Sequence, residues 1–164
     1  MIHVASRRRP GATIALAIGA LAIAGCSGAS RAPGNASAGA EPEAPAPAAN
    51  NVDTMTGATL AQFSGDAAAG QGVFAQCRSC HAVEPNTNRL GPTLHGVVGR
   101  RSGAVEGFNY SPANRNAGIV WTPEKLFQYL ENPRRVGPGT TMAFAGIGDP
   151  QRRADLIAYL ATLR

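Results

Sequence analysis

The sequence predicts an all-α domain of about 100 residues that is completed by a group other than protein. Two observations carry this prediction. Three segments begin at residues that cap helices, and each is bounded as a short helix would be. Roughly 40 residues between the first and second segments are rich in Gly, Asn and Pro and show little period, which a compact domain rarely contains without help.

The three predicted helices are 67–77 after the N-cap Asp66, 123–131 after Thr122, and 150–163 after Asp149. A proline at the first helical position supports the second and third. The second helix must end before Pro133, because the residue before a proline avoids the α region. In the third, the apolar residues Leu156, Ile157, Leu160 and Leu163 fall on one face.

Composition limits the number of domains and the class of partner. A chain of 164 residues and 16.8 kDa allows one domain once non-globular segments are removed. Three cysteines are too few for a disulfide scaffold, and 5 % aromatic residues exclude a large aromatic core. The net charge of +5 includes three arginines at 7–9, and no basic stripe is interleaved with aromatics, so no nucleic-acid partner is expected.

Residues 1–25 are predicted to be a targeting segment rather than part of the fold. Arginines at 7–9 precede an uncharged apolar run over 11–24, which ends in small residues and Cys26. This order resembles the bacterial lipobox, in which the cysteine is lipidated and becomes the new N-terminus. An uncleaved anchor and an ordinary cleaved signal remain open. All three place the rest of the chain on the periplasmic side of a bacterial membrane.

Residues 26–62 are predicted to be a flexible linker. They are rich in Ala, Pro, Gly, Ser and Asn, and no helical or strand period survives there. A flexible chain of this length spans about 33 Å r.m.s.. The globular domain is therefore expected over 63–164, on a tether.

The run CRSCH, Cys77 to His81, indicates the missing group. Two thiols three residues apart on a helical turn face one side and can add to the two vinyl groups of one haem. A thioredoxin-like pair, a disulfide or half a zinc site would also use Cys77 and Cys80. The histidine directly after the pair favours one covalently bound haem c, with His81 as an iron ligand.

The domain offers two candidates for the second iron ligand. Met142 lies in a glycine-containing segment without helical period, where it has no helix face to fill. His95 also lies in a loop, close to His81 in sequence. The sequence favours Met142, so the predicted metal ligands are His81 and Met142. A thioether favours ferrous iron and raises the potential relative to two histidines.

Seven runs match a known family in order across the domain: CRSCH, GPTLHGVVGR, GFNYSPAN, GIVW, YLENP, PGTTMAFAGI and DLIAYL. Residues 66–164 thereby resemble class I cytochrome c, in particular its mitochondrial-type and cytochrome c2 branch. The resemblance implies the class I cytochrome c fold, with helices and long loops wrapped around one haem.

The resemblance also implies further haem-binding residues. Pro92 orients the imidazole of His81 through its carbonyl group, and Phe144 covers the haem edge. Gly70 and Phe74 of the first helix meet Leu156 and Tyr159 of the last. The residues implied at a buried haem propionate are Arg100, Tyr110 and Trp121, and those implied in a polar network beside Met142 are Asn114, Tyr129 and Thr140.

Some positions depart from the mitochondrial members. Arg134 and Arg135 stand where two docking lysines are expected, and Thr141 replaces a third. The loop from His81 is one residue shorter than in the animal proteins, with Asn88 in place of a structural histidine. The partners of those proteins are therefore not carried over, although an arginine face still suits acidic partners.

We expect a monomeric monohaem c-type cytochrome, not an enzyme, that carries single electrons between donor and acceptor redox proteins. A bc1-type complex and a terminal oxidase or other periplasmic reductase are the partners considered, with the N-terminal segment attached to the membrane. The alternative is a haem enzyme or gas sensor in which the Met142 bond opens, but the sequence supplies no distal catalytic pair. A dedicated subunit of one membrane complex, rather than a diffusing carrier, also stays open.

Overall fold

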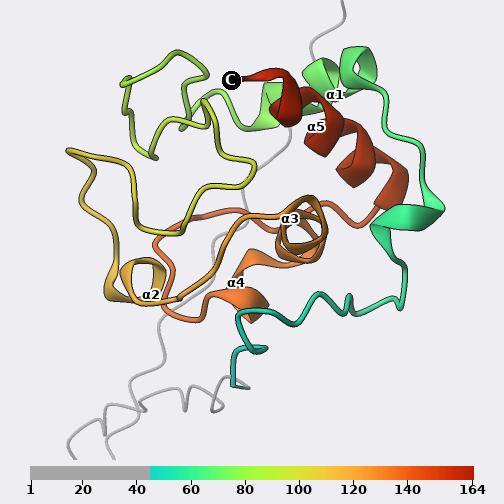
Figure 1. Ribbon diagram of the computed structural model, residues 1–164, viewed down its shortest axis with the longest axis horizontal. Helices are drawn as coiled ribbons and strands as arrows, with labels where there is room; N and C mark the ends of the chain where they lie inside the picture. The colour runs from blue at the N-terminus through green and yellow to red at the C-terminus, as the bar shows by residue number, and fades with distance from the viewer. Residues whose placement is uncertain (1–44) are drawn as a thin grey trace, which may run out of the picture. The chain divides into compact units, whose positions relative to one another are not determined.

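The computed structural model of the chain describes residues 45–164, which form helices joined by long loops (Figure 1). Within this part of the chain the β pairing is limited to one isolated antiparallel bridge, between Arg101 and Val120. The all-α prediction is therefore confirmed. The elements are η1 (Leu60–Gln62), α1 (Ala67–Val73), η2 (Phe74–Gln76), α2 (Pro112–Arg115), α3 (Pro123–Glu131), α4 (Pro133–Val136) and α5 (Pro150–Thr162).

The three predicted N-caps are confirmed by their hydrogen bonds. Asp66 accepts from two backbone N–H groups at the start of α1, and Asp149 does the same for α5. Thr122 accepts from the N–H of Lys125 in the first turn of α3. Each side chain satisfies donors that the first turn of a helix leaves without a partner.

The first helix is shorter than predicted. It ends at Val73, tightens into the 3-10 helix η2, and gives way at Cys77 to a turn in which the N–H groups of Cys80 and His81 both donate to the Cys77 carbonyl. Two glycines within α1 weaken it as a helix, so propensity does not extend it to Cys77. The CRSCH run therefore lies on a turn rather than on a regular helix.

The other helices differ little from expectation. Helix α5 ends at Thr162, one residue before the predicted end. The four-residue helices α2 and α4 were not predicted, because a single turn shows no period. Each begins at a proline after a capping side chain, Ser111 for α2 and Asn132 for α4.

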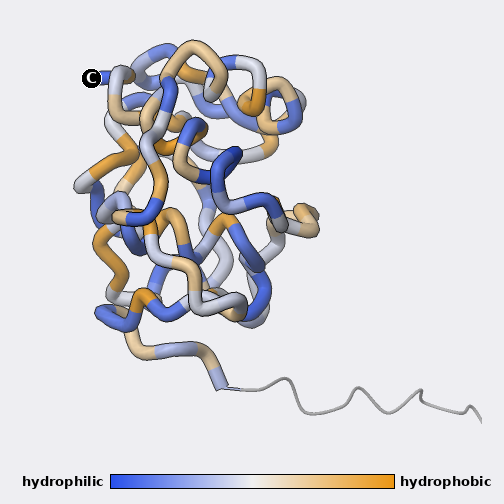
Figure 2. Tube along the Cα trace, turned by 90° about the vertical axis from the view of Figure 1, so that its right-hand side faces the viewer, coloured by the Kyte–Doolittle hydropathy of each residue, from blue (hydrophilic) through white to orange (hydrophobic). Residues whose placement is uncertain are grey.

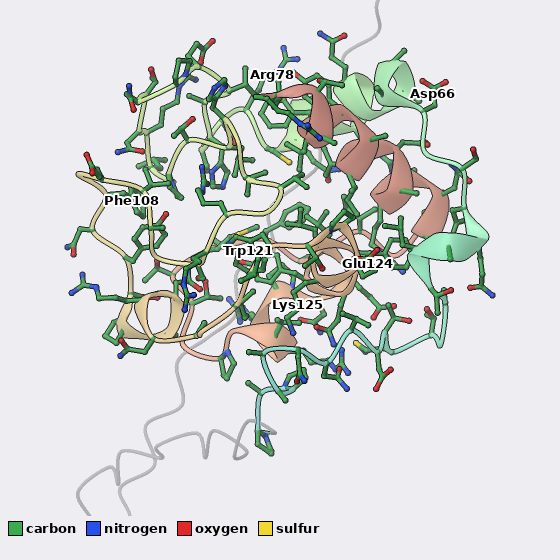
Figure 3. All side chains as sticks on the ribbon, viewed as in Figure 1. Asp66, Arg78, Phe108, Trp121, Glu124 and Lys125 are labelled. Carbon is green, nitrogen blue, oxygen red and sulfur yellow. The ribbon has the colours of Figure 1, made fainter. Side chains whose placement is uncertain are left out.

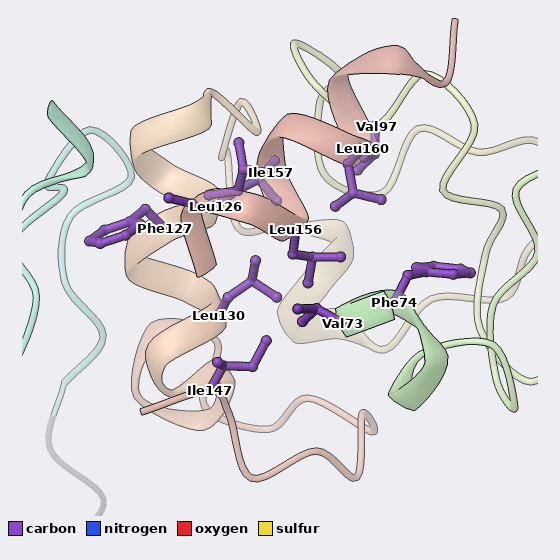
Figure 4. Close-up of a cluster of buried hydrophobic side chains, with 11 residues drawn as sticks. Val73, Phe74, Val97, Leu126, Phe127, Leu130, Ile147, Leu156, Ile157 and Leu160 are labelled. Atoms are coloured by element: carbon purple, nitrogen blue, oxygen red, sulfur yellow. The ribbon is translucent and has the colours of Figure 1, made fainter. Parts of the chain in front are cut away.

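Helices α1 and α5 lie side by side (Figure 1). A Cβ at Gly70 would collide with the backbone carbonyl of Asp155, so only glycine permits this approach. The rings of Phe74 and Tyr159 pack beside the crossing with centroids 5.5 Å apart. Helix α3 completes the core, where its Leu126 and Leu130 gather with apolar residues of α5 and α1 (Figure 4).

The end of the predicted linker differs from expectation. Residues 48–56, here called the strap, run against α3 and α4 with turns at 49–50 and 55–56, and are bound by side chains of those helices. The strap shows no hydrophobic period in the sequence, because the helices bind it largely through its backbone. The predicted targeting segment 1–25 and linker residues 26–44 lie outside the described residues.

None of the helices formed by residues 45–164 has the length and apolar character needed to cross a membrane. Figure 2 shows hydrophobic and hydrophilic residues interleaved along this part of the chain.

Candidate haem site

A cavity of about 500 Å³ lies between the loops and helices α3 and α5. This volume falls within the ~300–1,000 Å³ common for cofactor sites. Of the twelve haem-binding residues predicted from the sequence, eleven line it, and Thr140 is the exception. The eleven are Cys77, Cys80, His81, Pro92, Arg100, Tyr110, Asn114, Trp121, Tyr129, Met142 and Phe144.

Both cysteines of the CRSCH run line the cavity, and both thiols are free. Burial, and in smaller measure the neighbouring Cys80, raise the pKa of Cys77 to about 11. The turn at Cys77 separates the two cysteines by a single turn of chain, and both face the same cavity. The pair can therefore form two bonds to a single group in the cavity.

The ring of His81 is held by the backbone. Its Nδ1 lies 2.8 Å from the carbonyl oxygen of Pro92, which fixes the ring and leaves Nε2 as the free nitrogen for a metal. A Cβ at Gly91 would overlap the His81 ring, so only glycine leaves room for it. Burial lowers the pKa of His81, more than the Pro92 bond raises it, which favours the neutral imidazole that ligates metals.

Met142 lies in the segment between α4 and α5 and is held by polar neighbours. The hydroxyl of Tyr129 donates to its sulfur at 3.2 Å, and its backbone N–H donates to Thr140 Oγ1 at 3.2 Å. Asn114 Nδ2 donates to the same Thr140 oxygen at 3.4 Å. Thr140 thus supports the Met142 side of the cavity without lining it. Burial raises the pKa of Tyr129 to about 12, against a smaller opposing effect of Thr140.

Arg100 brings a cation to the cavity without a carboxylate to match it. Its guanidinium donates to the carbonyl oxygens of Thr93 and His95, each at 2.8 Å. The one ion pair formed among residues 45–164 lies elsewhere, between Arg153 and Glu131. Burial lowers the pKa of Arg100 and raises that of Tyr110 beside it. A half-buried cation of this kind suits an anionic group on the molecule that fills the cavity.

The indole of Trp121 packs on Tyr129, with ring centroids 4.7 Å apart (Trp121 is labelled in Figure 3). His95, the second candidate ligand, does not line the cavity. Its backbone N–H donates to Thr93 Oγ1, and its carbonyl receives Arg100. Of the two candidates, only Met142 reaches the cavity that holds His81.

Sequence reasoning missed much of the apolar lining. Pairs spaced four residues apart on α3 and α5 face the cavity, and this spacing is a signal that could have found them. Phe108 and Ser102 lie in loops without a period, where no such signal exists. The apolar residues missed as lining are Leu90, Leu94, Val97, Phe108, Leu126, Leu130, Ala143, Leu156 and Leu160.

The residues present fit a haem. Two thiols, an imidazole and a thioether meet in one cavity whose lining is mainly apolar. The guanidinium of Arg100 can pair with a carboxylate of the macrocycle. Any side chain at Gly91 would displace the His81 ring, so this position keeps that imidazole in the cavity.

Comparisons with known proteins agree with this fit. The Cytochrome c family model matches residues 67–164. Cytochrome c type-1 of Ascaris suum is 55 % identical over 97 residues, covering 58 % of this chain and 87 % of the relative. Cytochrome c2 of Rhodopila globiformis is 52 % identical over 101 residues, covering 61 % and 95 %. The solved structure of cytochrome cH from Methylobacterium extorquens is 46 % identical with a TM-score of 0.58, covering 60 % of this chain and 99 % of that one.

Proposed function

The chain belongs to the cytochrome c family of monohaem electron carriers, and on that premise we propose that it carries single electrons outside the cytoplasmic membrane with His81 and Met142 as the two iron ligands. Family membership confirms the class I fold and one haem c bound covalently through Cys77 and Cys80. One observation above all supports the ligand pair. His81 and Met142, far apart in sequence, line the same cavity as the two thiols.

When bound, the haem supplies an iron that changes by one electron between ferric and ferrous states. The protein's task is to hold the surroundings still during that change. Pro92 holds His81 through Nδ1, while Tyr129 and Thr140 hold Met142 at its sulfur and its backbone. Because both residues are restrained, the arrangement suits electron transfer rather than catalysis at the iron.

The cavity has one open edge, where an electron can enter and leave. Its exposed lining residues come from two segments only, 76–90 and 141–143. Leu90 is 83 % exposed there, and exposed Arg78 and Arg89 belong to the same stretch. An apolar contact flanked by arginines fits an acidic docking face on a redox protein. We propose a bc1-type complex and a terminal oxidase or other periplasmic reductase as such partners.

The proposed arrangement keeps this domain attached to a membrane. A targeting segment over 1–25 and a linker from Cys26 would place the domain, with 63–164 as its cytochrome part, on the periplasmic side. Mass spectrometry of the mature chain tests this. We expect a lipidated Cys26 as the N-terminal residue. An intact residue 1 would instead indicate an uncleaved anchor, and an unmodified N-terminus near Cys26 an ordinary cleaved signal.

Replacing Met142 tests the ligand assignment. Met142→Ala should keep the haem on a denaturing gel, because both thioether bonds remain, but should lose the sulfur-to-iron absorption band. We expect the potential to fall by about 200 mV, within the ~0.8 V over which axial ligands tune haem. Met55→Ala is the matched control, because Met55 is 63 % exposed and does not line the cavity.

The outcomes separate the alternatives. An unchanged spectrum and potential in Met142→Ala would show that another residue binds the iron. Rapid binding of carbon monoxide by the unaltered ferrous protein at neutral pH would favour the haem enzyme or gas sensor. A colourless product from a host that attaches haem c would contradict the function altogether.

A further inference from the structure

The strap is bound by a polar stripe along α3 and α4. Lys125, the chain's only lysine, has its ammonium nearly completely buried beneath the strap (Figure 3 labels it). Its Nζ donates to the carbonyl oxygens of Ala48 and Asn51, at 3.3 and 2.8 Å, and to Gln128 Oε1 at 2.7 Å. All three ammonium protons therefore have acceptors, two of them on the strap.

The stripe continues along the helix axis. Gln128 Nε2 donates to Asn51 Oδ1 at 2.7 Å and to the carbonyl of Asp53 at 2.9 Å. Arg135 of α4 donates to the same Asp53 carbonyl at 3.1 Å. Lys125, Gln128 and Arg135 recognise mainly backbone oxygens of the strap. Arg135 is thereby engaged with the strap rather than free for a redox partner.

Glu131, at the end of α3, joins the strap to the rest of the domain. Its carboxylate accepts from the backbone N–H of Met55 and, at 3.1 Å, from the hydroxyl of Thr56. The same carboxylate lies 3.5 Å from Arg153 Nη2 of α5. Glu131 thus touches the strap and α5 at once, with its side chain only 6 % exposed.

Arg153 extends this chain of contacts to the segment that carries Met142. Its side chain is fully buried, with the guanidinium carbon 4.4 Å from the centre of the Phe127 ring. Its Nη1 donates to the carbonyls of Ile147 and Gly148, at 2.7 and 3.0 Å. Its Nε and Nη2 find no hydrogen-bond partner among residues 45–164. The carboxylate of Glu131 is the acid in contact with it, and Asp149 adds a smaller favourable charge.

The Met142 segment, residues 137–148, is hydrogen-bonded at both ends to the region where α3 ends and α4 begins. At its start, the N–H of Gly137 donates to the Pro133 carbonyl at 2.9 Å. At its end, the N–H of Ile147 donates to the Leu130 carbonyl at 2.7 Å. A Cβ at Gly146 would collide with the carbonyl of Glu131, so the returning chain lies directly on the residue that binds the strap.

We propose that Glu131 and Arg153 are positioning residues that couple the strap to the Met142 segment, so that a docked strap keeps Met142 in place as an iron ligand. The coupling rests on the proposed function, because it takes Met142 as that ligand. The strap lies across α3 from the haem cavity: Leu126, Tyr129 and Leu130 line the cavity, whereas Lys125 and Gln128 bind the strap. The strap, through which a tether would join the domain, therefore acts on the iron site from the opposite face of α3.

The rate at which carbon monoxide binds the ferrous haem measures this coupling in the full-length protein, because the gas must wait for Met142 to leave. Glu131→Gln removes the charge that balances Arg153 and should raise the rate about tenfold. Glu124→Gln makes the same chemical change on an exposed residue of the same helix, and should leave the rate within about twofold. Far-UV circular dichroism in denaturant separates local release of Met142 from global unfolding.

A second variant acts on the strap without touching Glu131. Lys125→Met should expose residues 48–56 to protease and raise the carbon monoxide rate about threefold. If the strap is freed but the rate equals that of the unaltered protein, the coupling is wrong. Thr56→Val, which deletes one donor to Glu131, gives the same test should Glu131→Gln not fold, and an unchanged rate there also contradicts it. If the unaltered protein already binds the gas rapidly, it is the Met142 ligand assignment that fails.

Discussion

Helix α3 has one face toward the haem cavity and another toward the strap, and the two are buried in different ways. Leu126 and Leu130 cover the cavity face with apolar surface, around the hydroxyl of Tyr129. On the strap face, Lys125 and Gln128 are 1 % and 0 % exposed although both are strongly polar. One face is removed from water by packing, and the other by hydrogen bonds to the strap.

The difference teaches how each kind of burial is encoded. Burying a leucine side chain stabilises a fold by about 1.5–3 kcal/mol, so apolar positions must recur at helical spacing wherever they meet a core. A hydrogen bond contributes a net ~0.5–1.5 kcal/mol, and a lysine or glutamine on a helix is ordinarily exposed. The apolar face is thus visible in the sequence, whereas the polar face becomes a binding surface only once the strap is in place.

Matched truncations on the two faces should give unequal losses of stability. Leu130→Ala removes apolar contacts with the core cluster and the cavity and should lower the free energy of unfolding by about 2–5 kcal/mol. Gln128→Ala should lower it by about 1–2 kcal/mol, because the strap can exchange lost bonds for water. Chemical denaturation of the haem-loaded proteins measures both. Equal losses would mean that the strap is packed as firmly as the core.

Much of the scaffold could be predicted from local chemistry. Asp66, Thr122 and Asp149 mark helix starts because their side chains satisfy donors a few residues away. The CRSCH run identifies the haem because its two thiols and imidazole need no distant partner to be recognised. The resemblance to class I cytochrome c supplied the residues of the loops, and all but Thr140 line the cavity.

What escaped prediction depends on contacts between distant segments. The strap meets α3 across more than 70 residues of sequence, and nothing in its own composition indicates that Lys125 binds it. The end of the first helix at Val73 follows from a gradual loss of propensity at two glycines, not from a stop residue. Helices α2 and α4 are single turns, too short for their apolar spacing to show.

Tyr129 allows a smaller test of the cavity face, through its hydrogen bond to Met142. Tyr129→Phe removes that bond and should lower the free energy of unfolding by about 1 kcal/mol at neutral pH. It should also change the response to alkali. The pKa of Tyr129 is raised from 10.0 to about 12 by burial, so between these values the folded protein keeps a proton that the unfolded chain has lost.

Because the folded state binds more protons in that range, the stability of the unaltered protein should fall as the pH rises from 10 to 12, and the fall should be shallower in Tyr129→Phe. It should not vanish, since burial also raises the pKa of Tyr110. Tyr159→Phe is the matched control, as Tyr159 packs on Phe74 away from the cavity lining. Denaturation series at several alkaline pH values would compare the three slopes. If both variants lose stability with pH as steeply as the unaltered protein, the Tyr129 hydroxyl does not stay protonated beside the Met142 sulfur up to pH 12. The hydrogen bond on the cavity face would then be weaker than its burial implies.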